Sequence, residues 1–158
     1  MANTQSMCTS FLGEVMTATH NFGTAPIRAS GAADTFKAAL YLTSATVDAS
    51  TTAYSATGEV SGTGYSPGGV TVTNATPPAA TNSSSTAGVG YWTPSASIVY
   101  TTVTLTTAFD AVLIYNSTQS NKAVSVHTFG SQTITAGTFT LTMPANTTST
   151  ALLRLATT

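Results

Sequence analysis

Short segments in which apolar and polar residues alternate constrain the fold of this chain more than any other feature. Alternation with a period of two places successive side chains on opposite faces of a strand. It is clearest in Val70–Asn74, Ser97–Leu105, Lys122–Phe129 and Thr138–Met143. With Thr35–Leu42, Ala108–Tyr115, Thr133–Thr135 and Ala151–Ala156, these segments give about seven or eight strands. The long apolar helices of a βαβ fold are absent, so the pattern predicts an all-β, antiparallel sandwich or barrel.

The most apolar run, Ala108–Tyr115, indicates a central strand buried on both faces. The polar turn Asn116–Asn121 and the strand Lys122–Phe129 follow it, so Ala108–Phe129 is expected to form a hairpin. Inward-facing positions of these and neighbouring strands define the expected core. Its members are Phe36, Leu40, Val112, Ile114, Val124, Val126, Phe139 and Leu141.

Two long connections separate the strands of the first half. Thr43–Gly69 is polar, and its Gly58–Gly69 part lacks the Lys-Ser/Thr of a phosphate-binding loop while carrying the carboxylate of Glu59. We interpret Gly58–Gly69 as a bent β-connection that needs positive φ at several glycines. Thr76–Gly90, with its Pro-Pro and Ser-Ser-Ser, is expected to be a projecting loop.

The N-terminal segment follows a different pattern. Phe11, Val15 and Ala18 or Thr19 are spaced for a short helix over Ser10–His20. A chain of 158 residues suits one domain. We therefore expect an N-terminal helix or arm over 1–22 and a single β-sandwich domain over 23–158. The sandwich has its own core, so the helix must bury its apolar residues on that domain or on a partner.

Charged residues are scarce, at 6% of the chain against about 25% in a typical soluble domain. Exposed β-edges normally carry charge to prevent pairing. The scarcity favours a surface covered by partner copies, hence a homo-oligomer, over one kept soluble by hydroxyl groups alone. The four basic residues are too scattered for a phosphate-binding stripe, so direct nucleic-acid binding is not expected.

Other features bear on compartment. No apolar run has the length of a membrane span, and the first residues lack the pattern of a secretory signal. Cys8 is the single cysteine, which excludes an internal disulfide and is expected to be a buried or interface thiol. These features predict synthesis in a reducing cytoplasm and no membrane partner.

Residues for chemistry are few. His20 and His127 have no metal-ligand spacing with Cys8 or a carboxylate, and His127 is expected to be an exposed strand histidine. Asp48 and Glu59 flank one loop, where acids are more often solvated than paired. Many serines and Asp110 allow a triad on paper, but no Gly-x-Ser-x-Gly elbow supports it. We expect no catalytic residues, metal or cofactor.

Aromatic residues lie in or beside the long connections, at Tyr54, Tyr65, Tyr91 and Trp92. They favour loop anchoring or an inter-subunit contact over a carbohydrate-stacking surface. The N-terminal helix and the end of the second connection are apolar yet lie outside the strand pattern. The candidate partner contacts are Phe11, Val15, Met16, Tyr91 and Trp92.

Several segments resemble small virion proteins of tailed bacteriophages. They include the opening Met1–Phe11, Asp34–Leu42, Tyr54–Tyr65, Ile114–Thr118 and the ending Gly137–Pro144 with Ala151–Arg154. The resemblance spans nearly the whole chain, although Leu12-Gly13 stands where the family usually has Lys or Glu after Phe11.

The resemblance implies a virion role without catalytic residues. Among such roles we expect a head decoration, or cement, protein, made in the bacterial host's cytoplasm and built into the phage head. Its expected partners are the major capsid protein, or another virion protein, and copies of itself, with a trimer favoured by the resemblance alone. The alternatives are a tail or head-spike component that contacts the host, and a carbohydrate-binding β module that uses Tyr91 and Trp92.

Overall fold

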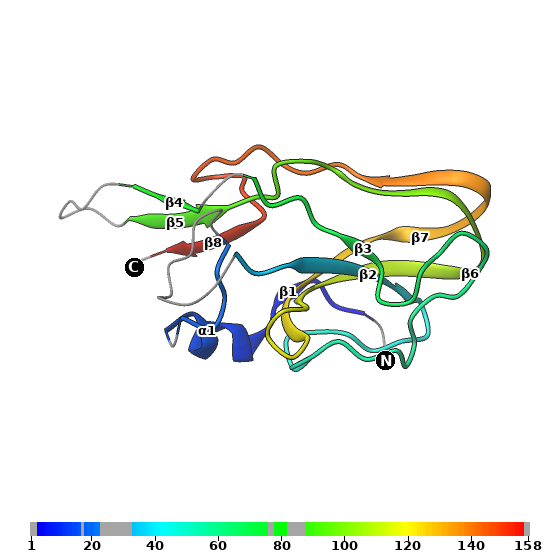
Figure 1. The fold of residues 1–158 in the computed structure, drawn as a ribbon, viewed down its shortest axis with the longest axis horizontal. Coiled ribbons are helices and arrows are strands. Elements are labelled where there is room, and N and C mark those ends of the chain that lie inside the picture. Colours follow the sequence, from blue (N-terminus) through cyan, green and yellow to red (C-terminus); the bar gives the residue numbers. More distant parts are fainter. Residues whose placement is uncertain (1–2, 17, 23–32, 76–77, 82–87, 157–158) are drawn as a thin grey trace.

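The computed structural model describes residues 3–16, 18–22, 33–75, 78–81 and 88–156, without the side chains of Thr9, Leu12 and Met16. The fold is all-β and antiparallel, as predicted, and its sheets do not close into a barrel (Figure 1). The elements are β1 (Ser6–Met7), α1 (Thr9–Met16), β2 (Phe36–Leu42), β3 (Val70–Thr71), β4 (Ala79–Ala80), β5 (Val89–Trp92), β6 (Ile98–Asn116), β7 (Lys122–Leu141) and β8 (Leu153–Ala156).

The strands form a five-stranded sheet in the order β1-β7-β6-β2-β3 and a three-stranded sheet in the order β4-β5-β8. The hairpin expected over Ala108–Phe129 is confirmed, since Asn116 pairs with Lys122 across the turn. The prediction of two separate strands, Ser97–Leu105 and Ala108–Tyr115, is wrong, because β6 is one continuous strand through Thr106 and Thr107. β7 likewise joins three predicted strands into one, with bulges in place of turns.

The β6–β7 hairpin folds back on itself. Phe129 and Phe139 are ten positions apart on β7, which is about 33 Å in an extended strand, yet their ring centroids lie 5.2 Å apart. The register with β6 shifts repeatedly between Tyr100 and Ala111, and such bulges bend a strand pair. Figure 1 shows the hairpin turning at one end of the molecule and returning above β2. One hairpin therefore supplies both layers.

The core lies between these layers. The Tyr100 hydroxyl, on the returning half of β6, donates a hydrogen bond to the Ala38 carbonyl of β2 at 2.8 Å. Six of the eight expected core residues are buried. Phe139 and Leu141 are partly buried, because they lie on the returning half of β7 at the edge of the second layer.

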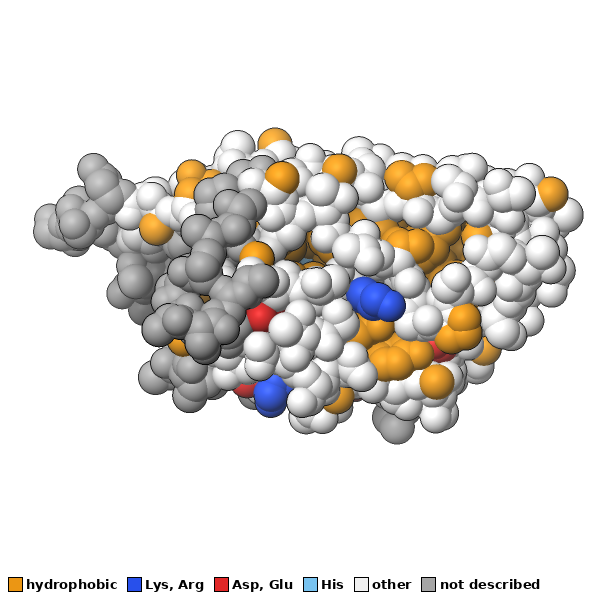
Figure 2. All heavy atoms as spheres, viewed as in Figure 1, with side chains coloured by type: hydrophobic (Ala, Val, Ile, Leu, Met, Phe, Trp, Pro, Cys, Tyr) orange, Lys and Arg blue, Asp and Glu red, His pale blue; other side chains and the backbone are white. Residues whose placement is uncertain are grey.

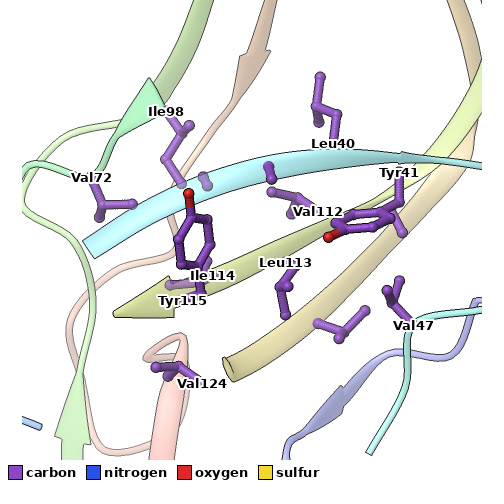
Figure 3. Close-up of a cluster of buried hydrophobic side chains, with 14 of the residues drawn as sticks. Leu40, Tyr41, Val47, Val72, Ile98, Val112, Leu113, Ile114, Tyr115 and Val124 are labelled. Carbon is purple, nitrogen blue, oxygen red and sulfur yellow. The ribbon is translucent and has the colours of Figure 1, made fainter. Parts of the chain in front are cut away.

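β2 and the part of β6 that pairs with it, Phe109–Asn116, are largely buried on both faces, as expected for the central strand. Leu40 pairs with Val112 on one face and Ala39 with Leu113 on the other, and all four are buried. The connection from β2 to β3 covers this sheet with Val47 and with Tyr54, whose ring stacks on Tyr115 at 4.7 Å. Figure 3 shows the labelled apolar side chains gathered around β2 and β6.

The glycine-rich connection has the expected conformation, with positive φ at Gly58, Gly64, Gly68 and Gly69. Its close approach to β2 also explains the need for glycine. A Cβ on Gly69 would lie 1.7 Å from the Ala38 carbonyl oxygen. Hydrogen bonding between Thr63 and Thr104 joins the connection to β6.

Three boundaries differ from the predictions. α1 ends at Met16, short of His20, and Ala18 beyond it has positive φ. β3 is only two residues long, because just Lys37 and Ala38 of β2 pair with it. The described part of Thr76–Gly90 is not all loop, since it contains β4 and the start of β5. β5 is fixed by pairing with the distant β8, a contact that no local pattern reveals.

The substitution Gly69→Ala should destabilise the protein by several kcal/mol, because it adds a backbone clash to a left-handed φ, which alone costs about 1–3 kcal/mol. Gly130→Ala is the matched control, since a Cβ there meets nothing within 4 Å. Urea denaturation measures both. Equal midpoints for the two variants would contradict the placement of the connection.

Leu40→Ala and Ile114→Ala should each lower the free energy of unfolding by about 2–5 kcal/mol, because each leaves a cavity in the core. Thr101→Ala, at an exposed position of β6, is the control and should stay within about 0.5 kcal/mol of the wild type. If Leu40→Ala and Ile114→Ala have the same melting temperature as the wild type, the assignment of the core faces is wrong.

Candidate functional site

An apolar hollow of about 250 Å³ lies between α1 and the three-stranded sheet. Its floor is aromatic: Phe22 stacks on Phe36 with ring centroids 4.4 Å apart and lies 4.6 Å from the ring of Trp92. The indole N–H of Trp92 donates to the Asn74 side-chain oxygen at 3.0 Å. The hollow is lined by Phe11, Val15, His20, Phe22, Pro78, Ala79, Gly90, Tyr91, Trp92, Leu153 and Leu155.

The rim of this hollow exposes apolar surface. Val15, Val99 and Leu155 are the markedly exposed large hydrophobic residues among those described, and two of them, Val15 and Leu155, line the hollow. Tyr91 is half-buried beside them. Clustered apolar side chains of this kind mark interaction sites more often than single ones do.

The structure brings together four of the five contact residues expected from the sequence. Phe11 and Trp92 are buried in the floor, while Val15 and Tyr91 line the hollow nearer solvent. The fifth, Met16, has a side chain outside the described residues. Sequence reasoning missed Leu153 and Leu155, although their alternation within the predicted last strand places them on one face.

A polar network lies behind the hollow. Glu14 contacts the His20 Nε2 and the Lys122 Nζ, each at 2.6 Å. The Asn116 Nδ2 lies 3.1 Å from the His20 Nδ1 and donates to Asp34 at 2.8 Å. The network links the N-terminal segment to the β6–β7 turn, so it fixes the position of α1 on the body.

The hydrogen bonds determine the protonation of His20. The Asn116 side-chain oxygen accepts the backbone N–H groups of Thr118 and Gln119, so its amide group faces His20. The His20 Nδ1 must then accept, and Nε2 carries the proton given to Glu14. Burial lowers the pKa of His20 despite the attraction of Glu14, in keeping with a neutral ring.

Glu14 remains charged in this network. Its burial raises the pKa, but hydrogen bonds from Lys122 and His20 outweigh that effect and hold the pKa below its usual value. Both ring nitrogens of His20 are engaged, so neither is free to act as a general base toward a substrate in the hollow. The Glu–His pair therefore holds the helix in its orientation on the body of the protein.

His127 is half-buried, which corrects the expectation of an exposed strand histidine. Its Nε2 lies 2.9 Å from the hydroxyl oxygen of buried Ser125. Burial lowers the pKa of His127 to about 4, and no carboxylate contributes to that shift. A Ser–His pair without an orienting acid lacks the third member of a hydrolytic triad.

Glu59 differs from the solvated loop acid expected. Its carboxylate accepts hydrogen bonds from the hydroxyls of Tyr54 and Tyr65, at 2.6 and 2.7 Å, and from the Gly68 N–H at 2.7 Å. Burial and these bonds raise the pKa of both tyrosines. Asp48, in contrast, accepts from Ser50 within its own turn. Tyr54 and Tyr65 thus anchor loops and present no stacking surface.

The expectation of a buried thiol is confirmed for Cys8, and burial raises its pKa to about 11. In the described ranges, His, Cys, Asp and Glu side chains form no group of three able to hold a metal ion. Among the same residues, no helix has the length and apolar character needed to cross a bilayer.

Comparison of the chain with protein-family models, with curated proteins and with solved structures found no match to any of them.

Stability should fall as the pH drops from about 6.5 to about 4, because the unfolded chain protonates His127 more readily than the folded protein does. The loss from this residue is at most about 3 kcal/mol. His127→Gln removes the titrating group, so the variant should lose less stability over this range. Urea denaturation at several pH values measures it.

Between about pH 7 and pH 9 the folded and unfolded chains both carry neutral histidines, so this range is the internal control. There the difference in stability between His127→Gln and the wild type should stay constant. An unchanged acid sensitivity in His127→Gln would show that His127 is not the group responsible.

Proposed function

We propose that the protein is a non-enzymatic structural component of a virion, a decoration (cement) protein that stabilises the head of a tailed bacteriophage. Its partners are the major capsid protein, or another virion protein, and further copies of itself. It is made in the host cytoplasm and becomes part of the particle. It makes no direct contact with nucleic acid and has no membrane partner.

The apolar hollow carries the proposal. A contact through Val15, Tyr91 and Leu155 would remove exposed apolar surface from water, which is the main favourable term in most protein association. The aromatic floor beneath is packed and hydrogen-bonded, so the contact surface is already formed before binding. Preformed surfaces lose little conformational entropy when a partner docks.

The electrostatics favour a structural contact of this kind. Few charged side chains are visible on the face shown in Figure 2, and the whole chain carries a formal net charge of −1. Attachment would depend on apolar burial and backbone hydrogen bonds. Its affinity should therefore change little with salt, unlike a contact steered by charge.

Only part of the described N-terminal segment is available for such a contact. Cys8, Phe11 and Phe22 are buried in the protein's own core, so deletion of residues 1–22 would damage the fold as well as any contact. Val15 is the exposed large apolar residue among those side chains of α1 that the structure describes. We therefore assign the anchoring contact to Val15 together with Tyr91 and Leu155.

Val15→Ser and Leu155→Ser should each weaken attachment to heads about tenfold or more, because each removes apolar area from the contact. Val99→Ser is the matched control. Val99 is 39% exposed, against 38% for Val15 and 40% for Leu155, but does not line the hollow. Co-sedimentation with heads prepared without the protein measures binding, at about 0.05 M and about 0.5 M NaCl.

If Val15→Ser and Leu155→Ser bind heads as well as Val99→Ser does, the hollow is not part of the contact. Failure of the wild type to bind heads would refute the decoration role. Imaging labelled protein on intact particles separates the alternatives, because tail or vertex labelling would favour a tail or spike component. A glycan screen with Tyr91→Ala as the comparison tests the carbohydrate-binding module.

A further inference from the structure

One side of β7 is largely unpaired. Its inner side pairs with β6 along the strand, whereas its outer side pairs with β1 only at Ser125 and Val126. Two further backbone bonds reach its start, at Ala123 and Val124. From His127 to Leu141, no backbone hydrogen bond joins the outer side to any other described segment.

This edge lacks the features that normally prevent strand pairing. Exposed edges are usually protected by charged side chains, by proline or by a covering segment. No Asp, Glu, Lys or Arg occurs from Ala123 to Leu153, and the first proline after β7 begins is Pro144. The residues in between are rich in Thr, Val, Ile and Phe, which favour strands.

The segment Thr138–Leu141 is the straight part of the edge. Phe139, Thr140 and Leu141 pair with three successive residues of β6 without a register shift. Thr138, Thr140 and Thr142 are exposed. A regular strand with free backbone donors and acceptors on one side specifies its partner as another extended strand.

We propose that Thr138–Thr142 pairs antiparallel with the same segment of a second copy of this chain. Centred on Thr140, that pairing sets Thr138 opposite Thr142 and Thr140 opposite itself, and cross-strand threonine pairs stabilise sheets. With no charge on the edge, two identical copies meet without repulsion. A charged partner strand would find no opposite charge on this edge to form an ion pair with. This favours a second copy of the chain as the partner.

This pairing of two copies deepens the proposed function. It rests on that function only for its place in a virion. Pairing of one edge with itself is isologous and closes on two copies. It therefore replaces the trimer favoured by the resemblance with a dimer. It also leaves the apolar hollow, on the three-stranded sheet, available for a different partner.

The test uses the purified full chain in sedimentation equilibrium at micromolar concentration. The wild type should be a dimer, while Thr140→Lys and Thr140→Glu should each be monomers, because two like-charged side chains would stand directly opposite each other with their Cβ atoms about 5 Å apart. An equimolar mixture of the two variants should restore a dimer. Thr101→Lys, exposed on β6 in the same layer, is the control and should remain dimeric.

A monomeric or trimeric wild type, or a dimeric Thr140→Lys, would overturn the proposal. Monomeric Thr101→Lys would also overturn it, by placing the contact on the sheet face. Hydrogen exchange needs no variant: the amides of Thr138–Thr142 should become more protected as the wild-type concentration rises. Unchanged exchange would count against pairing. Failure to bind heads by a wild type that dimerises would refute the decoration role alone.

Discussion

The reversal of the β6–β7 hairpin is the constraint on which the other features depend. It allows one hairpin to cover the sheet that its own turn-side half, with Phe109–Asn116 of β6, forms with β2. The contact of Phe129 with Phe139 closes this arrangement. The bend carries a cost, because Thr102 and Ala136 have positive φ, at roughly 1–3 kcal/mol each. Burial of Tyr100, Val103 and Phe109 offsets it: full burial of one large apolar side chain contributes about 1.5–3 kcal/mol.

The reversal also determines where the connections can run. The glycine-rich connection passes along β6 near Thr102 and Thr104, so close that a Cβ on Gly62 would lie 2.1 Å from the Thr104 carbonyl oxygen. Glu59 accepts hydrogen bonds from Tyr54 and Tyr65. The Tyr65 hydroxyl in turn accepts from the Leu40 N–H of β2, and the Tyr54 ring stacks on Tyr115 of β6. A loop that would otherwise be free is thereby tied to the core at several points. The second layer is consequently held on one side by hydrogen bonds and open on the other, along β7.

Most strands could be predicted because period-two alternation depends only on neighbouring residues. The joining of predicted strands into β6 and β7 could not, because Gly130–Gln132 looks like a turn locally and is a bulge only in the presence of its partner strand. The sheet β4-β5-β8 depends on pairing between residues such as Trp92 and Leu153, far apart in the chain. For the same reason the sequence could mark Val15 and Tyr91 as apolar residues without strand partners, but not show that they line one hollow.

The distribution of charge explains how so neutral a protein can have a specific fold and a nearly uncharged surface. Glu14 and Lys122 contact each other, Glu59 accepts three internal hydrogen bonds, Asp34 is buried and Asp110 accepts a bond from Asn3. Arg154 donates to the backbone carbonyls of Thr148 and Ser149. Most of the nine charged residues thus stabilise contacts within the chain. Few charges therefore remain to repel another uncharged surface that approaches the protein.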